Sequence, residues 1–283
     1  MVVVGGGTAG LEAACTAAEM GCRTVLLEQS DQLGGLASKI SLIPEKKRIT
    51  DFVTYQRNRA SSLKNLEVRL GAEADLKTIE SLSPDLVVAA TGSSPLLPPI
   101  PGLKEELAKP GRKVHTIVDF LGNLDSFRDP AGKIVVIGGG AVGLDVAEYF
   151  AALGAKDVSI VEMFDAIARD VDFITKIDIR DMLSRPDAPK VFTSTTLRQV
   201  KADAFVVERN GETIEMPFDK GFVCLGMTAN KPLEEELCEY CRASDIPMIN
   251  IGDRRQARRI IDGVREGRDV KNVIMRLSEE KVA

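Results

Sequence analysis

The stretch VVVGGGTAG, residues 2–10, is a short apolar run that breaks into glycines close to the start of the chain. A similar stretch, IVVIGGGAVG, occupies residues 134–143. In both, the apolar run predicts a buried parallel strand, and three glycines with the spacing Gly-x-Gly-x-x-Gly lead into a predicted helix. The chain of 283 residues therefore contains the same strand–turn–helix motif twice.

Each motif continues in the same order to a second strand that ends at an acidic residue, Glu28 in the first copy and Glu162 in the second. The first glycine and the acid are 23 positions apart in one copy and 24 in the other. Both spacings are close to the roughly 20 positions typical of a dinucleotide-binding βαβ motif. Glycines of this kind can be simple turn residues, but the complete order found twice favours dinucleotide binding.

The residue types fit that chemistry. The first glycine makes the tight turn, the second lets the backbone approach a pyrophosphate, and the third lets the helix pack close to the strand. The helix N-terminus directs unpaired N–H groups and a partial positive charge at the phosphates, and the acid accepts hydrogen bonds from a ribose. We therefore expect one dinucleotide site formed by Gly5, Gly7, Gly10 and Glu28 and a second formed by Gly138, Gly140, Gly143 and Glu162.

A further buried strand follows each motif and ends at Thr91-Gly92 in the first half and at Leu225-Gly226 in the second. Between the halves, the prolines of residues 93–102 exclude helix and central strand and indicate a crossing between domains. We expect an α/β protein with two Rossmann-like dinucleotide-binding domains, the second inserted in the first. Residues 1–111 and 226–283 would form the first domain, and residues 112–225 the second.

Composition excludes several classes of function. The net charge is −5, and no Lys/Arg cluster precedes the C-terminal region, so neither nucleic acid nor an anionic membrane is favoured as a partner. No apolar run is long enough to span a membrane, and the N-terminus lacks the features of a signal peptide. Five cysteines in a chain of this size suit a reducing compartment, and we expect a cytoplasmic protein.

Four longer segments carry a specific resemblance. They are LEQSDQLGGLASKISLIPEKKRI (27–49), VVAATGSSPLLPPIPG (87–102), IVEMFDAIARDVD (160–172) and NIGDRRQARRIIDGVREG (250–267). Together with the two motifs they resemble the two-dinucleotide flavoproteins related to glutathione reductase. Within that group the chain is most similar to the C-terminal FAD- and NAD(P)-binding portion of the 2,4-dienoyl-CoA reductase, 2-enoate reductase and trimethylamine dehydrogenase family.

The resemblance implies FAD in the first site and NAD(H) in the second. Gly34 and Gly35 would lie along the FAD pyrophosphate, Thr91 and Gly92 would close the site, and the Gly252-Asp253 turn would bind the ribityl chain. Of the arginines that follow (Arg254, Arg255, Arg258 and Arg259), we expect at least two to be solvated. We predict no catalytic side chain, because hydride transfer between two cofactors needs stacking and orientation more than an acid or base.

Full-length members of the family carry an FMN-binding barrel and an iron–sulfur cluster before this region. Nothing in the chain corresponds to them, so we expect a fragment or a barrel-less relative. The function that the resemblance implies is electron input. NADH reduces FAD, and electrons then pass to an FMN/iron–sulfur partner domain or another acceptor for enoate-type reduction. Glu162 favours NADH over NADPH, unless an arginine such as Arg169 neutralises a 2′-phosphate.

Two alternatives remain. The first is a self-contained NADH:acceptor reductase, or a disulfide reductase that uses Cys238 and Cys241. Four neighbouring glutamates argue against the redox role because nearby negative charge raises the pKa of a thiol, and two cysteines alone do not make a metal site. The second alternative is a non-catalytic scaffold with ADP in the first site, as in the trimethylamine dehydrogenase branch.

Overall fold

The computed structural model describes residues 1–169, 171–232 and 234–280. The chain divides into two compact units. The first unit contains Met1–Leu42, Lys46–Ser94 and the described residues from Thr228 onward, and the second contains Ile43–Glu45 and Pro95–Met227. Each unit is built on a five-stranded parallel sheet. The α/β class with two Rossmann-like sheets is therefore confirmed.

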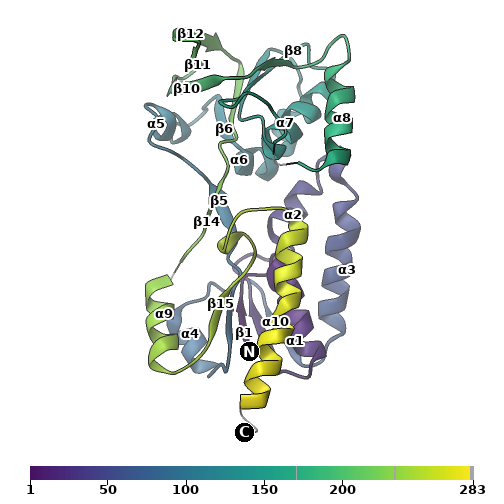
Figure 1. Ribbon diagram of the computed structural model, residues 1–283, viewed down its shortest axis with the longest axis vertical. Helices are drawn as coiled ribbons and strands as arrows, with labels where there is room; N and C mark the ends of the chain where they lie inside the picture. Colours follow the sequence, from purple (N-terminus) through teal and green to yellow (C-terminus); the bar gives the residue numbers. More distant parts are fainter. Residues whose placement is uncertain (170, 233, 281–283) are drawn as a thin grey trace. The chain divides into compact units, whose positions relative to one another are not determined.

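The sheet of the first unit has the strand order β15-β4-β1-β2-β3. Figure 1 labels its strands β1 and β15. Its strands are β1 (Val2–Val4), β2 (Thr24–Leu27), β3 (Leu66–Arg69), β4 (Val87–Ala89) and β15 (Met248–Asn250). Its helices are α1 (Thr8–Glu19), α2 (Gly35–Ile40), α3 (Ile49–Ser62), α4 (Leu76–Ser81), α9 (Glu234–Ala243) and α10 (Ile260–Glu280), with short 3-10 turns at Pro44–Lys46 and Gly252–Arg254.

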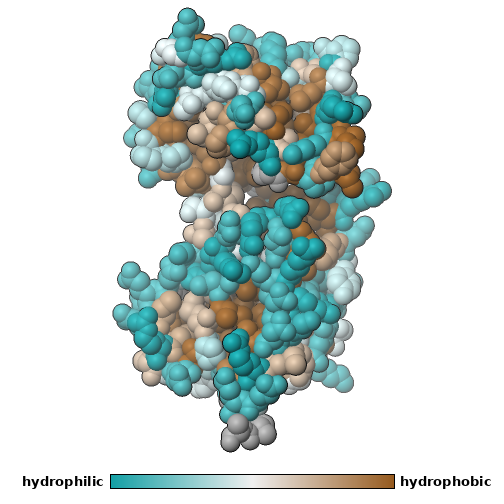
Figure 2. All heavy atoms as spheres, in the orientation of Figure 1, coloured by the Kyte–Doolittle hydropathy of each residue, from teal (hydrophilic) through white to brown (hydrophobic). Residues whose placement is uncertain are grey.

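Both faces of this sheet are buried, which explains why its strands are continuous apolar runs. Val3 packs with the apolar residues of α1 and α10, whereas Val2 on the opposite face packs with Ile79 of α4 and Leu237 of α9. The helix α10 is amphipathic, and Figure 2 shows mainly hydrophilic side chains along its outer face. Within the described residues, the structure contains no helix long and apolar enough to cross a membrane.

The sheet of the second unit has the order β6-β13-β7-β8-β9. Its strands are β6 (Val114–Thr116), β7 (Lys133–Ile137), β8 (Asp157–Val161), β9 (Lys190–Phe192) and β13 (Lys220–Val223). The helices of this unit are α5 (Leu103–Leu107), α6 (Ile117–Gly122), α7 (Ala141–Ala152) and α8 (Phe173–Leu183), with a 3-10 turn at Leu124–Phe127. An antiparallel sheet of β10 (Thr195–Val200), β11 (Ala204–Arg209) and β12 (Glu212–Pro217) is added to it. Asn210 and Gly211, both with positive φ, form the turn between β11 and β12.

The compact units do not follow the expected boundary at residue 111. Residues 95–111, which we expected in the first domain, belong to the second unit. The reason is α5: its Leu103 is fully buried, and Leu107 packs with it in the core that also contains Val114 and Val135. The chain crosses between the units at β5 (Ser93–Pro95) and β14 (Met227–Ala229), which pair with each other.

Candidate functional site

The first glycine turn is shaped by three glycines with different roles. Gly5 has φ +105°, and a Cβ there would lie 2.3 Å from the carbonyl oxygen of Ala90. A Cβ on Gly10 would lie 1.9 Å from the carbonyl oxygen of Gly5. A Cβ on Gly7 would meet nothing within 4 Å, and Gly7 has the extended backbone of a helix N-cap. Packing therefore requires Gly5 and Gly10, whereas Gly7 leaves space before the N-terminus of α1.

Glu28 is buried at the end of β2 and faces this turn. Its Oε2 accepts a hydrogen bond of 2.6 Å from the N–H of Gly6, and its Oε1 accepts from the N–H and hydroxyl of Ser30 at 2.8 and 2.7 Å. The sequence predicted that Glu28 accepts hydrogen bonds from a ribose, but it did not reveal that the carboxylate also stabilises the glycine turn. Each carboxylate oxygen has two acceptor positions, so Glu28 keeps capacity for a ligand hydroxyl.

The loop after Glu28 returns to the same turn. The N–H of Gly34 donates to the carbonyl oxygen of Gly6 at 2.7 Å. A Cβ on Gly35 would lie 3.0 Å from the Cα of Gly7. Gly34 and Gly35 both have positive φ, which glycine adopts without strain. The pair expected along a pyrophosphate thus lies directly beside the open space at Gly7.

The remaining residues expected in the first site follow two neighbouring strands. Thr91-Gly92 comes after β4 and Gly252-Asp253 after β15, and β4 lies between β1 and β15 in the sheet. Asp253 accepts hydrogen bonds from the Ser93 hydroxyl at 2.8 Å and the N–H of Arg258 at 3.3 Å. The ten residues predicted for this site therefore lie in the segments that follow β1, β2, β4 and β15, on the side of a parallel sheet where α/β proteins bind ligands.

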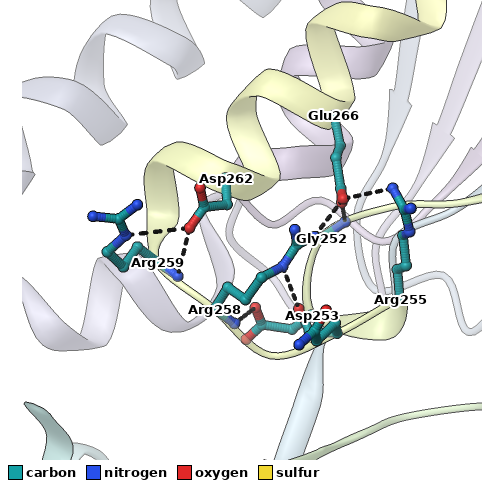
Figure 3. A network of polar contacts seen from close by, with 8 residues as sticks. Gly252, Asp253, Arg255, Arg258, Arg259, Asp262 and Glu266 are labelled. Atoms are coloured by element: carbon teal, nitrogen blue, oxygen red, sulfur yellow. Dashed lines mark hydrogen bonds and ion pairs between the residues drawn. The ribbon is translucent and has the colours of Figure 1, made fainter. Parts of the chain in front are cut away.

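A network of ion pairs supports the turn after β15 (Figure 3). The carboxylate of Glu266, on α10, accepts a hydrogen bond of 2.7 Å from the N–H of Gly252 and pairs with Arg255 and Arg258. Arg259 pairs with Asp262 at the start of the helix. Arg255 and Arg259 have exposed side chains, as expected for at least two of the four arginines.

Arg254 differs from its three neighbours because only 2% of the residue is exposed. Its Nε donates to Asn250 Oδ1 at 2.7 Å, and its Nη1 donates to Thr91 Oγ1 at 3.1 Å and to the carbonyl oxygen of Asn230 at 2.9 Å. The sequence did not distinguish this buried arginine from the exposed ones. Only its place directly after Asp253, at the end of a strand, could have indicated it.

The second unit repeats the glycine turn. A Cβ on Gly138 would lie 2.2 Å from the carbonyl oxygen of Cys224, and one on Gly143 would lie 1.9 Å from that of Gly138. Gly140, the N-cap of α7, has φ −77° and ψ −178°, close to the −69° and −179° of Gly7. Two matched turns therefore precede two matched helices.

The acid of the second unit is also held by its turn. Oε2 of the buried Glu162 accepts a hydrogen bond of 2.7 Å from the N–H of Gly139, and Oε1 accepts from the N–H of Phe164 at 2.9 Å. Ala168, with φ +58°, donates its N–H to the carbonyl oxygen of Gly139 at 2.8 Å, as Gly34 does to Gly6. Arg169 lies over the Phe164 ring, 4.5 Å from its centroid, and its guanidinium is 3.6 Å from Asp165.

Cys238 and Cys241 both lie within α9. Cys241 is buried in the core beside Val2 and Val25, and this burial raises the pKa of its thiol. Among the residues that the structure describes, no group of three His, Cys, Asp or Glu side chains could hold a metal ion. The cysteine pair is therefore poorly placed for nucleophilic chemistry.

The sequence pattern of one family, pyridine nucleotide-disulphide oxidoreductase, matches residues 1–248. The chain belongs to this family. It is 36% identical over 274 residues to the NADH oxidase of Thermoanaerobacter brockii, covering 94% of this chain and 40% of the relative. It is 28% identical over 295 residues to the cinnamate reductase of Clostridium sporogenes, covering 96% and 39%.

Among solved structures, the chain is similar to 2-naphthoyl-CoA reductase in complex with 2-naphthoyl-CoA, with a TM-score of 0.81 and 25% identity over 94% of this chain and 38% of the other. The resemblance to the enoate reductase family and its glutathione-reductase-like fold is confirmed. Family membership places the chain among NAD(P)H-dependent flavoprotein oxidoreductases that use FAD. The chain spans about two fifths of the length of these three relatives.

Proposed function

We propose that the first unit binds FAD, that the second binds NADH, and that the chain transfers a hydride from NADH to FAD. The observation that carries this proposal is the open space at Gly7, in front of the N-terminus of α1 and next to Gly34-Gly35. A Cβ would fill this space, yet no packing within the described residues requires a glycine there. A pyrophosphate that approaches the protein backbone at this position explains why the residue is a glycine.

In this proposal the chain's own residues bind and orient. The N–H groups at the start of α1 and α7 stabilise phosphates, and Glu28 and Glu162 accept hydrogen bonds from ribose hydroxyls. Asp253 is held by Ser93 and the Arg258 N–H in an orientation suited to the ribityl chain. When bound, FAD supplies the isoalloxazine ring that accepts the hydride. The FAD domain would correspond to residues 1–94 and 228–283, and the NADH domain to residues 95–227.

We infer further that the electrons pass from the flavin to an acceptor outside these two dinucleotide-binding units. The similar proteins include reductases named for cinnamate and 2-naphthoyl-CoA, both of which are conjugated substrates. An FMN- or iron–sulfur-containing domain is the partner that suits such a transfer. Enoate-type reduction would then take place at that partner.

Two assays test the proposal. The purified chain, reconstituted with FAD, is mixed with NADH under anaerobic conditions in a stopped-flow instrument, and loss of the oxidised flavin absorbance is expected. In steady state the same protein should reduce ferricyanide or a quinone with NADH but should not reduce cinnamate. Turnover of cinnamate would reveal a substrate site within this chain. Failure of NADH to reduce bound FAD would favour a nucleotide-binding scaffold.

A further inference from the structure

The buried guanidinium of Arg254 is a positive charge that has no carboxylate partner in the part of the chain that the structure describes. The three arginines that follow it (Arg255, Arg258 and Arg259) each form an ion pair with Glu266 or Asp262. Among the described residues, no carboxylate lies within ion-pair distance of Arg254, and its hydrogen bonds go to neutral oxygens. A desolvated charge is costly when unpaired, so its presence needs an explanation.

One donor of this guanidinium is also unused. Nη2 of Arg254 is buried and has no hydrogen-bond partner among the described residues. Buried polar atoms without partners are rare in folded proteins, and each indicates strain or a group that is missing. Burial lowers the pKa of Arg254, and the negative charges of Glu234 and Cys238 offset only part of this effect. The guanidinium still remains protonated at neutral pH.

The position of Arg254 connects this charge to the proposed FAD site. Its two side-chain partners are Asn250, the last residue of β15, and Thr91, two residues beyond the end of β4. Both strands end at the edge of the sheet where α/β proteins bind ligands. Arg254 also directly follows Asp253 and contacts Thr91, two residues that we assign to flavin binding.

We propose that Arg254 supplies a fixed positive charge to the FAD site that stabilises the reduced flavin relative to the oxidised flavin. This inference rests on the proposed function. Hydride transfer places two electrons and one proton on the isoalloxazine ring and leaves a net negative charge there. A preorganised positive charge on a buried side chain favours that product electrostatically. Arg254 would therefore raise the midpoint potential of the bound flavin.

Two substitutions remove the charge in different ways. Arg254→Met eliminates the cation and keeps a long side chain. Asn250→Asp keeps the arginine and neutralises it, because an almost isosteric carboxylate replaces the amide oxygen that lies 2.7 Å from Nε. The second variant retains the acceptor that Arg254 contacts in the wild type, so it should fold even if the first does not. Matched controls are Arg265→Met on α10 and Asn58→Asp on α3, both at exposed positions.

The measurement is the midpoint potential of the FAD-reconstituted protein, obtained by equilibration with a reference dye, together with FAD occupancy and thermal unfolding. For a two-electron couple, a tenfold change in the ratio of affinities for reduced and oxidised flavin shifts the potential by about 30 mV. We expect Arg254→Met and Asn250→Asp each to lower the potential by about 30 to 60 mV, which corresponds to a tenfold to hundredfold change. The two controls should match the wild type.

Wild-type potentials in both charge-removing variants would overturn the proposal and leave Arg254 a structural residue. Loss of FAD from both variants, with the protein still folded, would also overturn it, because Arg254 would then be needed for binding and not for the potential. The proposed function fails separately, if the wild-type protein does not bind FAD or if NADH does not reduce it.

Discussion

Gly10 packs so closely on Gly5 that a Cβ on Gly10 would lie 1.9 Å from the Gly5 carbonyl oxygen. Earlier in the same turn, at Gly7, the situation reverses: beyond Gly7 and its neighbours, a Cβ there would have no atom within 4 Å. Although both glycines belong to one motif, we therefore predict that substitution of Gly7 impairs ligand binding and that substitution of Gly10 impairs folding.

We expect Gly7→Val to give folded but colourless protein, because a Cβ at this position contacts nothing in the turn and the side chain blocks approach of the FAD pyrophosphate. The loss of a glycine N-cap should cost about 1 kcal/mol of stability at most. Gly10→Ala should instead be poorly soluble or unfolded, since its Cβ collides with the backbone. Visible absorbance and circular dichroism of the two variants check this. Full flavin content in Gly7→Val would refute the site.

The motifs themselves could be predicted because they are local. The strand, the glycine spacing, the helix and the acid all lie within about 30 residues of each other, so periodicity and turn chemistry identify them without knowledge of packing. Recognising Gly34-Gly35 and Gly252-Asp253 needed the family resemblance, because neither pair has a distinctive spacing of its own.

What the sequence did not reveal depends on contacts between distant segments. The compact units depart from the boundary at residue 111 because the burial of Leu103 and Leu107 depends on side chains of other strands, such as Val200 and Phe205. Arg254 was not separated from the exposed arginines because its partners Thr91 and Asn230 are more than 20 residues away. Charge density along the chain gives no information on such contacts.

The buried acid of α1 provides a prediction about stability. Glu12 accepts a 2.7 Å hydrogen bond from Arg59 on α3, and Arg59 also forms a two-pronged pair with Glu19. Arg59→Met leaves the Glu12 carboxylate buried, with the exposed Arg268 as its remaining cation among the described residues and the Thr16 hydroxyl as a hydrogen-bond donor. We expect a loss of about 3 kcal/mol in the free energy of unfolding, measured in urea. Arg69→Met, at the exposed Glu67 pair, should change it by less than about 1 kcal/mol.

The pair of Arg59 with Glu19 should make the stability of the protein depend on pH in the acidic range. The hydrogen bond from Arg59 holds the pKa of Glu19 below its ordinary value. A lowered carboxyl pKa contributes stability above the ordinary value, and the contribution is lost as the pH falls through the lowered one. Wild-type protein should therefore lose more stability than Arg59→Met across this acidic range. Parallel losses in the two proteins would contradict this assignment.

The cysteines should be dispensable for electron transfer from NADH to ferricyanide. Burial raises the pKa of Cys15 to about 11 and that of Cys224 to about 12, so both thiols stay protonated and slow to alkylate at neutral pH. Cys238→Ser removes the pair with Cys241 and should leave ferricyanide reduction unchanged. Mass spectrometry after iodoacetamide treatment and steady-state rates test both points. A large drop in rate in Cys238→Ser would support the disulfide reductase alternative.

The second site should prefer NADH to NADPH. Glu162 is fixed by the N–H groups of Gly139 and Phe164, so its carboxylate cannot move away from a 2′-phosphate, and burial strengthens the repulsion. Arg169, the arginine best placed to neutralise such a phosphate, already stacks on Phe164 and faces Asp165. Anaerobic reduction of the flavin should therefore be faster with NADH at equal, subsaturating concentrations.

Glu162→Gln tests the cause of this preference. The amide keeps the size of the side chain and removes its charge, and its NH2 group replaces an oxygen that accepts a hydrogen bond from Gly139 or Phe164. NADH should therefore bind at least about tenfold more weakly, since a hydrogen bond to a charged group contributes about 1.5 to 3 kcal/mol. NADPH binding should weaken less or improve, because the repulsion is gone, and the ratio of the two affinities should narrow. Glu212→Gln, on the exposed face of β12, serves as the matched control. An unchanged ratio in Glu162→Gln, or faster reduction of the wild-type flavin by NADPH, would show that another residue selects the coenzyme.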